Sequence, residues 1–192
     1  MEMQYHPDGS KGVETHFDAG LRTGNTTGWF ANGTLQLEGQ FKNNAQVGAW
    51  RQYHPNGQLA LEGSWIKGLQ SGVWNTYHQA GGPESVASYE KGKVVGLTQE
   101  WHANGQRRVY GFIVDGHQIG AFFAFDEQGA LLRKASAYYV GGKPARALNE
   151  TEMAQAATIA ADTAPKDPAT PVPGAPVKKP EEGAEDGAED GE

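Results

Sequence analysis

The chain has 192 residues, no cysteine and a formal net charge of −7 at pH 7. Residues 1–144 contain equal numbers of basic and acidic residues, so the whole net charge belongs to residues 145–192. Because neither segment offers a basic surface, the composition argues against nucleic-acid binding and disfavours membrane contact through charge.

A 24-residue period runs through residues 1–144 and predicts a stack of about six hairpin units. One glycine column consists of Gly9, Gly33, Gly57, Gly81, Gly105 and Gly129, and a second of Gly24, Gly48, Gly72, Gly96 and Gly120. An aromatic column consists of Tyr5, Trp29, Tyr53, Tyr77, Trp101 and Phe125. Units that repeat at this distance bury their apolar faces against one another, which favours an all-β, elongated, single-layer antiparallel hairpin array.

The clearest unit, residues 49–72, reads as strand, tight turn, strand and looser turn. Residues 50–53 predict a short first strand, and His54, Pro55, Asn56 and Gly57 predict a turn that closes with a bulge. The return strand alternates Leu59, Leu61, Gly63 and Trp65 on one face, and residues 67–72 are expected to turn the chain into the next unit.

Two features inside the strands call for particular packing. Glycine weakens a strand unless a large group lies over it, so Gly39, Gly63 and Gly111 predict a ring above them from the column of Trp50, Trp74 and Phe122. Trp50 and Tyr53 are three residues apart, so either a bulge restores them to one side or both faces of the sheet are partly apolar.

Several later positions depart from the unit pattern. Pro83 and Ser85 replace leucines, so we expect the return strand of residues 73–96 to be the weakest in the array. Arg107 and Ala137 also depart from the pattern, which predicts less regular hairpins in the later units.

The segment after residue 144 has a different composition. Asn149 and Glu152 are typical of a helix start, and a weak stripe of small residues predicts a short helix within residues 145–161. This helix either caps the last repeat or stays isolated and frays. Residues 162–192 are rich in Ala, Pro, Glu and Gly and are expected to be a disordered, solubilising acidic tail. The alternative is that the acidic part folds back on a basic patch or mimics an anionic ligand.

Two columns of ionisable residues invite chemical hypotheses. His6, His54, His78 and His102 share one column, as do Glu14, Glu38 and Glu62. Equivalent residues of adjacent hairpins lie two strands, or about 10 Å, apart, whereas ligands of one zinc ion lie within about 4 Å of each other. We therefore expect no metal, no cofactor and no catalytic residue; the histidines are read as structural rings beside the turns and the glutamates as solvated face residues.

The residues of the repeat unit resemble the MORN repeat, specifically the variant of the bacterial YwqK-like antitoxin family. Its unit has the form G-x-W-x-x-Y-x-x-N-G-x-L-x-x-E-G-x-W/Y-x-x-G. Residues 48–68 match this form, and looser matches extend over residues 1–144. The resemblance implies consecutive hairpins in one twisted sheet, and a role in protein scaffolding or phospholipid contact. The antitoxin label further implies a toxin protein as partner, occluded by the array.

A single-layer sheet cannot hide both faces, so part of its aromatic residues should form a protein-binding surface. The candidate interaction residues are Trp29, Trp50, Tyr53, Trp74, Tyr77 and Trp101. We predict a noncatalytic protein-binding or scaffolding module, with a peripheral membrane protein or a cell-envelope structural protein as the alternatives.

The expected location is the cytoplasm, because the sequence shows neither a signal peptide nor an apolar run near the ~20 residues of a membrane span. The chain opens inside a repeat unit, so a segment upstream of Met1 is compatible with it. The sequence indicates neither an oligomeric state nor a particular partner.

Overall fold

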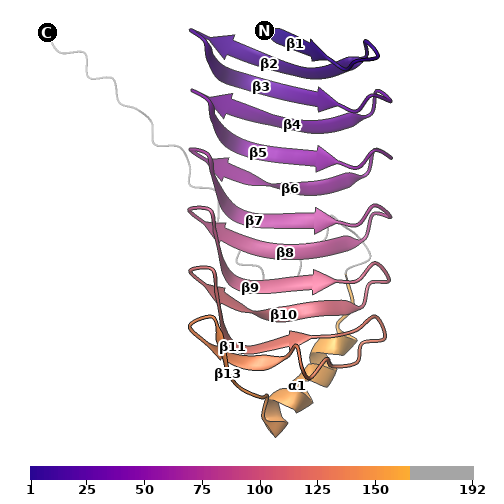
Figure 1. Ribbon diagram of the computed structural model, residues 1–192, viewed down its shortest axis with the longest axis vertical. Helices are drawn as coiled ribbons and strands as arrows, with labels where there is room; N and C mark the ends of the chain where they lie inside the picture. Colours follow the sequence, from indigo (N-terminus) through magenta and orange to yellow (C-terminus); the bar gives the residue numbers. More distant parts are fainter. Residues whose placement is uncertain (165–192) are drawn as a thin grey trace, which may run out of the picture.

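A computed structural model describes residues 1–164, and most of the predicted tail, residues 165–192, lies outside the described residues. Thirteen strands form one antiparallel sheet in which every strand pairs with its neighbours in the sequence (Figure 1). The prediction of an elongated single-layer hairpin array is thereby confirmed. The strands are β1 (Glu2–Tyr5), β2 (Lys11–Asp18), β3 (Leu21–Trp29), β4 (Leu35–Lys42), β5 (Ala45–Tyr53), β6 (Leu59–Ile66), β7 (Leu69–Tyr77), β8 (Pro83–Glu90), β9 (Lys93–Trp101), β10 (Arg107–Val114), β11 (His117–Ala124), β12 (Ala137–Val140) and β13 (Lys143–Arg146).

The turn within each unit, such as residues 54–58 between β5 and β6, follows the predicted chemistry. We call these turns the wide turns. In the turn between β5 and β6 the N–H of Gly57 donates to the carbonyl of His54 at 2.8 Å, and Gly57 has a φ of +84°. The strand register shifts directly beside this turn, between Gln52 and Tyr53, so the predicted bulge is present. A positive φ of this size is the reason for glycine here.

The second kind of turn is shorter than expected. Only Lys67 and Gly68 connect β6 to β7, both with positive φ, as in the two-residue turns that match the twist of a hairpin. Gly72 lies inside β7 instead of ending a six-residue turn. The prediction of a turn over residues 67–72 was therefore wrong, and the first strand of each unit is correspondingly longer.

The second glycine column marks a bulge within these longer strands. Gly48 has a φ of +66°, and between the pairs Glu38–Arg51 and Gln40–Val47 the chain of β5 advances four residues while β4 advances two. The extra residues bend the strand, and bent strands are visible along the whole array (Figure 1). The 24-residue spacing of these glycines does not by itself indicate that they mark a bulge.

This bulge sets the two sides of the sheet. Trp50 packs its ring over Gly39, where an added Cβ atom would overlap it, and the same holds for Trp74 over Gly63 and Phe122 over Gly111. The predicted ring-over-glycine packing is confirmed. We call this side the glycine face.

Tyr53 lies on the other side, which we call the tyrosine face. Its hydroxyl donates to the carboxylate of Glu38 at 2.8 Å, and Glu38 alternates with Gly39 along β4. Trp50 and Tyr53 therefore point to opposite faces. The second alternative therefore holds, because both faces carry aromatic side chains. A bulge is present at Gly48, but it does not bring the two rings to one side.

Consecutive hairpins are tied together at both ends. At the wide turns His54 Nε2 lies 2.8 Å from the carbonyl oxygen of Tyr77, and the same contact recurs for His6, His78 and His102 with the residue 23 positions later. At the short turns the N–H of Gly68 donates to the carbonyl of Gln46 at 2.9 Å. The histidines thus have the structural role that the sequence predicted.

The array is regular through β11 and irregular after it. The turn Gly141–Gly142 follows Asp115–Gly116 by 26 residues instead of 24, and β12 keeps only four residues. The expected irregularity is therefore present near Ala137, whereas β8, which begins with Pro83, has the full eight residues. A proline at the first strand position removes no donor that the sheet requires.

The last strand and a helix close the described chain. β13 ends at Arg146, two residues beyond the predicted end of the array, and α1 (Glu150–Ala161) follows. α1 begins with the predicted capping box, in which Asn149 accepts from the N–H of Glu152 while the Glu152 carboxylate accepts from the N–H of Asn149. It lies at the end of the array away from β1 (Figure 1).

Candidate protein-binding face

The tyrosine face changes character along the array. In its first half, β4 to β7 present Glu38, Arg51, Glu62 and Asn75, whereas the equivalent positions of β10 and β11 are Tyr110 and Phe123. The N-terminal part of the face is therefore polar and the C-terminal part is aromatic. Because one part is polar and the other aromatic, different groups contact them.

Helix α1 covers the aromatic part. Ala156 is 3% exposed and packs against Phe123 and Phe125, with Tyr110 and Ile159 at the edge of the cluster. Small side chains on this side of the helix allow it to lie close to the flat rings. Of the two alternatives for the helix, docking on the array is the one the structure shows.

A buried arginine holds the end of α1 on this face. Arg107 is 1% exposed; its guanidinium donates to the Gln99 side chain at 2.7 Å and to the Asp162 carboxylate at 2.5 Å. It also stacks over the rings of Trp101 and Tyr110. Burial lowers the pKa of Arg107, and the charge of Asp162 opposes this change.

The sequence marked Arg107 only as a departure from the unit pattern. A leucine stands at the same position in the second and third units, so a cation at a leucine position was the available signal of a special contact. Its partner Asp162 was assigned to the disordered tail, and the structure places it instead against the sheet.

Helix α1 does not cover the polar part of the face, which is ordered by its own hydrogen bonds. The hydroxyls of Tyr53 and Tyr77 donate to Glu38 and Glu62 at 2.8 and 3.0 Å, and Arg51 lies 3.5 Å from each carboxylate. Burial and the acceptor carboxylates raise the pKa of both tyrosines, so their hydroxyls remain donors at neutral pH.

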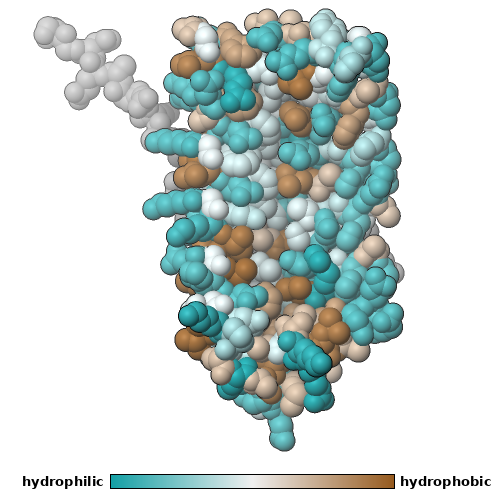
Figure 2. All heavy atoms as spheres, viewed as in Figure 1, coloured by the Kyte–Doolittle hydropathy of each residue, from teal (hydrophilic) through white to brown (hydrophobic). Residues whose placement is uncertain are grey.

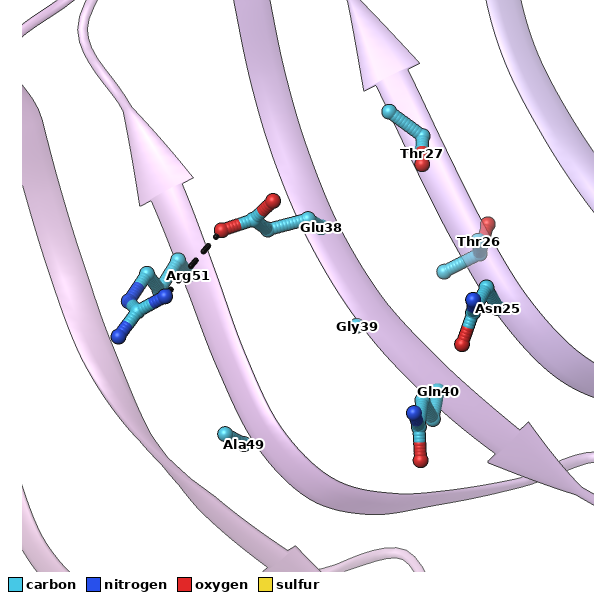
Figure 3. A pocket seen from close by; sticks show the side chains of 8 residues that line it. All are labelled: Asn25, Thr26, Thr27, Glu38, Gly39, Gln40, Ala49 and Arg51. Atoms are coloured by element: carbon cyan, nitrogen blue, oxygen red, sulfur yellow. Dashed lines mark hydrogen bonds and ion pairs between the residues drawn. The ribbon is translucent and has the colours of Figure 1, made fainter.

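A hollow lies beside this group, over β3, β4 and β5 (Figure 3). Its lining is polar and includes Asn25, Thr27, Glu38, Gln40 and Arg51. The Arg51 side chain is 52% exposed and that of Glu38 41%, so both remain accessible to a ligand from this side. Figure 2 shows hydrophilic and hydrophobic residues interleaved along one side of the array, without a continuous apolar patch.

The six predicted interaction residues do not share one exposed face. Trp50 and Trp74 belong to the glycine face and are each 5% exposed, and Tyr77 and Trp101 are buried on the tyrosine face. Trp29 and Tyr53 are half-buried and are the accessible members of the set. A role of these residues in binding stays a prediction.

Neither column of ionisable residues forms a metal site in the described part of the chain. Within residues 1–164 no three His, Cys, Asp or Glu side chains are close enough to hold a metal ion. Glu38 and Glu62 are not simply solvated, because each is fixed by a tyrosine and by Arg51. Over the same residues no helix is long and apolar enough to cross a membrane.

Comparison with known proteins gives a match to a family model for two of the units. The comparison with curated proteins found no match. MORN repeats are generally associated with protein or membrane binding. Two adjacent segments, residues 22–43 and 46–67, match the family model of the MORN repeat variant, and they correspond to the hairpins β3–β4 and β5–β6.

Proposed function

We propose that this protein is a noncatalytic protein-binding module whose partner lies along the N-terminal part of the tyrosine face, which α1 does not cover. The observation that supports this most directly is α1, which packs on the other part of the same face. The face thus accommodates a packed polypeptide segment, and its polar part is the portion that α1 leaves accessible.

The polar part has the properties of a binding platform. Tyr53 is held in place by Glu38, and Arg51 is held by two carboxylates. Binding of a partner would therefore cost little conformational entropy for these side chains. Tyrosine and arginine are the residue types that dominate the energy of many protein interfaces. The exposed edges of Glu38 and Arg51 offer both an acceptor and a donor to the partner.

The chemistry of the same group supports binding over catalysis. A carboxyl group that acts as a general acid must remain protonated near neutral pH, usually through burial without a cationic neighbour. Glu38 and Glu62 each accept a tyrosine hydrogen bond and face the cationic Arg51, so neither lies in such an environment. Fixed carboxylates of this kind suit recognition.

A peripheral membrane protein is the second candidate function, since MORN repeats are associated with membranes as well as with proteins. Occlusion of a toxin would be one form of the protein-binding function. One experiment separates protein binding from membrane binding, because binding to lipid vesicles and binding to a protein partner are measured independently.

The test compares two charge reversals in the full chain. Arg51→Glu changes the tyrosine face, and Arg108→Glu changes an arginine of similar exposure that pairs with Glu100 elsewhere on the sheet. We expect proteins captured from a lysate by the wild type and by Arg108→Glu to bind Arg51→Glu at least about fivefold more weakly. Each captured protein is then purified and titrated against all three forms.

Equal affinity for both variants would contradict this placement of the site. Retention on anionic vesicles, without any protein that discriminates between the variants, would support the membrane function instead. Circular dichroism of the three forms checks that each substitution leaves the sheet intact.

A further inference from the structure

Exposed hydrophobic residues gather beside two of the short turns. Within residues 1–164 eleven large hydrophobic residues are exposed, and five of them flank the turns at 67–68 and 115–116. Strand pairing places these five in two groups, one at each turn. The groups are Ile66 with Leu69, and Phe112 with Val114 and Ile119. Each of the two turns therefore carries an apolar patch of its own.

A charged turn lies between the two patches. It is the turn at 91–92, where Glu90 pairs with Lys93 across the strands. Ile66, Glu90 and Val114 occupy the same position in three successive units, so they point to one side of the sheet. Hairpins are two strands, or about 9.6 Å, apart, so the patches lie at equal distances from the charged turn. Hydrophobic and hydrophilic residues alternate along the left edge of Figure 2, where Figure 1 places the short turns.

The tips of the two apolar turns carry opposite charges. Lys67 and Asp115 are both exposed and have φ angles of +50° and +51°. Aspartate, asparagine and glycine are the residues that such a turn favours, so its conformation accounts for Asp115 but not for Lys67. The two tips are two hairpins, or about 19 Å, apart and are too distant to pair within one chain. Neither side chain forms an ion pair with any other residue in 1–164.

This order of features is complementary to itself. Strands β6 to β11 follow one another in the sheet, with the turn at 91–92 at their centre. A twofold axis beside that turn, perpendicular to the stack, places the turn at 67–68 of one copy opposite the turn at 115–116 of a second copy. Leu69 then faces Val114 of the second copy. Each apolar patch thus meets the other, and the contact occurs twice.

The same axis brings opposite charges together. Lys67 faces Asp115 of the second copy, and symmetry repeats this pair. Glu90 faces Lys93 of the second copy, again twice. Lys91 lies nearest to the axis, where Glu90 of both copies supplies negative charge. The charges therefore favour this register of the two arrays over a shift by one hairpin, which would set Lys67 against Lys91.

We propose that this protein forms an antiparallel dimer, in which the short turns at 67–68, 91–92 and 115–116 contact the same turns of a second copy. Burial of the apolar patches stabilises the contact, and the charged pairs set its register. This inference goes beyond the proposed function, because a dimer carries two copies of the tyrosine face and would bind a bivalent partner more tightly than the monomer does.

Sedimentation equilibrium of the full chain tests for the dimer. Three turns on each side bury less area than a standard interface, so we expect a dissociation constant on the order of 10–100 µM. A protein that stays monomeric at concentrations about tenfold above this range would overturn the proposal.

A charge swap tests which turns meet. Lys67→Glu and Asp115→Lys should each weaken the dimer at least about tenfold, because each sets two like charges against each other. The double variant should restore the wild-type dissociation constant. Because the two residues are too far apart to pair within one chain, this rescue requires contact between copies. Asp18→Lys, a matched change on the same edge outside the three turns, should leave the dimer unchanged.

A single cysteine tests the position of the axis. The chain has no cysteine of its own, so Lys91→Cys places one thiol beside the proposed axis. Ala19→Cys is the control, since Ala19 has a similar φ of +46° at the tip of the first short turn. We expect disulfide-linked dimers of Lys91→Cys to form at least about fivefold faster, because a disulfide requires two Cα atoms within about 7 Å.

Three results would refute the assignment. They are single variants that dimerise as the wild type does, a double variant without rescue, and equal cross-linking at positions 91 and 19. Circular dichroism of each variant checks that the sheet is intact. None of these measurements involves a partner of the tyrosine face, so their failure would leave the proposed function standing.

Discussion

Single glycine positions set how closely an aromatic ring packs on the sheet. Gly63 carries the ring of Trp74, and the ring of Trp65 meets Trp74 edge-on with centroids 5.3 Å apart. A Cβ atom has no room at this position, because the ring lies directly on the backbone. Gly82, in contrast, has no atom near the place where its Cβ would be and has no positive φ.

Two alanine substitutions measure this difference. Gly63→Ala should lower the stability by about 1–3 kcal/mol because it forces the tryptophan ring out of its place. Gly82→Ala should be near neutral, because an alanine there restricts the unfolded chain and meets no obstacle. Urea midpoints of the two variants give the comparison, and equal midpoints would show that the ring has room to move.

An ion pair lies at the beginning of helix α1. Glu152 accepts from both Nη atoms of Arg146, at 2.7 and 2.8 Å, and from the N–H of Asn149. The hydrogen bonds from Arg146 lower the pKa of Glu152 to about 2, with the Asn149 N–H as the next cause. Because the pKa of Glu152 is lower in the folded state, its charge stabilises the helix at pH values above the unfolded pKa of 4.5. This stabilisation is lost as the pH falls toward 2.

We therefore expect the helical circular-dichroism signal of the wild type to decrease between pH 4.5 and about 2. Glu152→Gln should give a weaker helix signal at pH 7 and a flatter profile over the same range, since it keeps the acceptor but loses the charge. A variant profile as steep as that of the wild type would assign the transition to other carboxyl groups.

The whole molecule is a linear stack, so its length should be adjustable in whole units. Deletion of residues 49–72 joins Gly48 to Val73 exactly as Gly72 is joined to it in the wild type. Trp74 would then pack over Gly39, as Trp50 does. Only neighbouring repeats interact in such an array, which is why removal of one preserves the others.

This deletion should give a folded protein about 10 Å shorter, measured by small-angle scattering. Removal of residues 49–60 instead joins strands out of register and should abolish the cooperative transition, because it places polar residues where the rings belong. Loss of folding in both deletions would indicate that the stack is not modular.

The sequence by itself determined the repeat and much of its internal packing. Glycine at a fixed period requires positive φ or close approach of a ring, so the wide turns and the packing of Trp50 over Gly39 could be predicted from spacing alone. The capping box of α1 is equally local, because Asn149 and Glu152 are three residues apart.

Only the tertiary structure decided which side chains share the tyrosine face and what packs on it. The bulge at Gly48 separates Trp50 from Tyr53, and no local pattern distinguishes a bulge glycine from a turn glycine when both have positive φ. The contact of Arg107 with Asp162 joins residues 55 positions apart, and docking of α1 depends on rings contributed by β10 and β11. Such contacts arise from packing between distant segments, whose free energy no periodicity in the chain records.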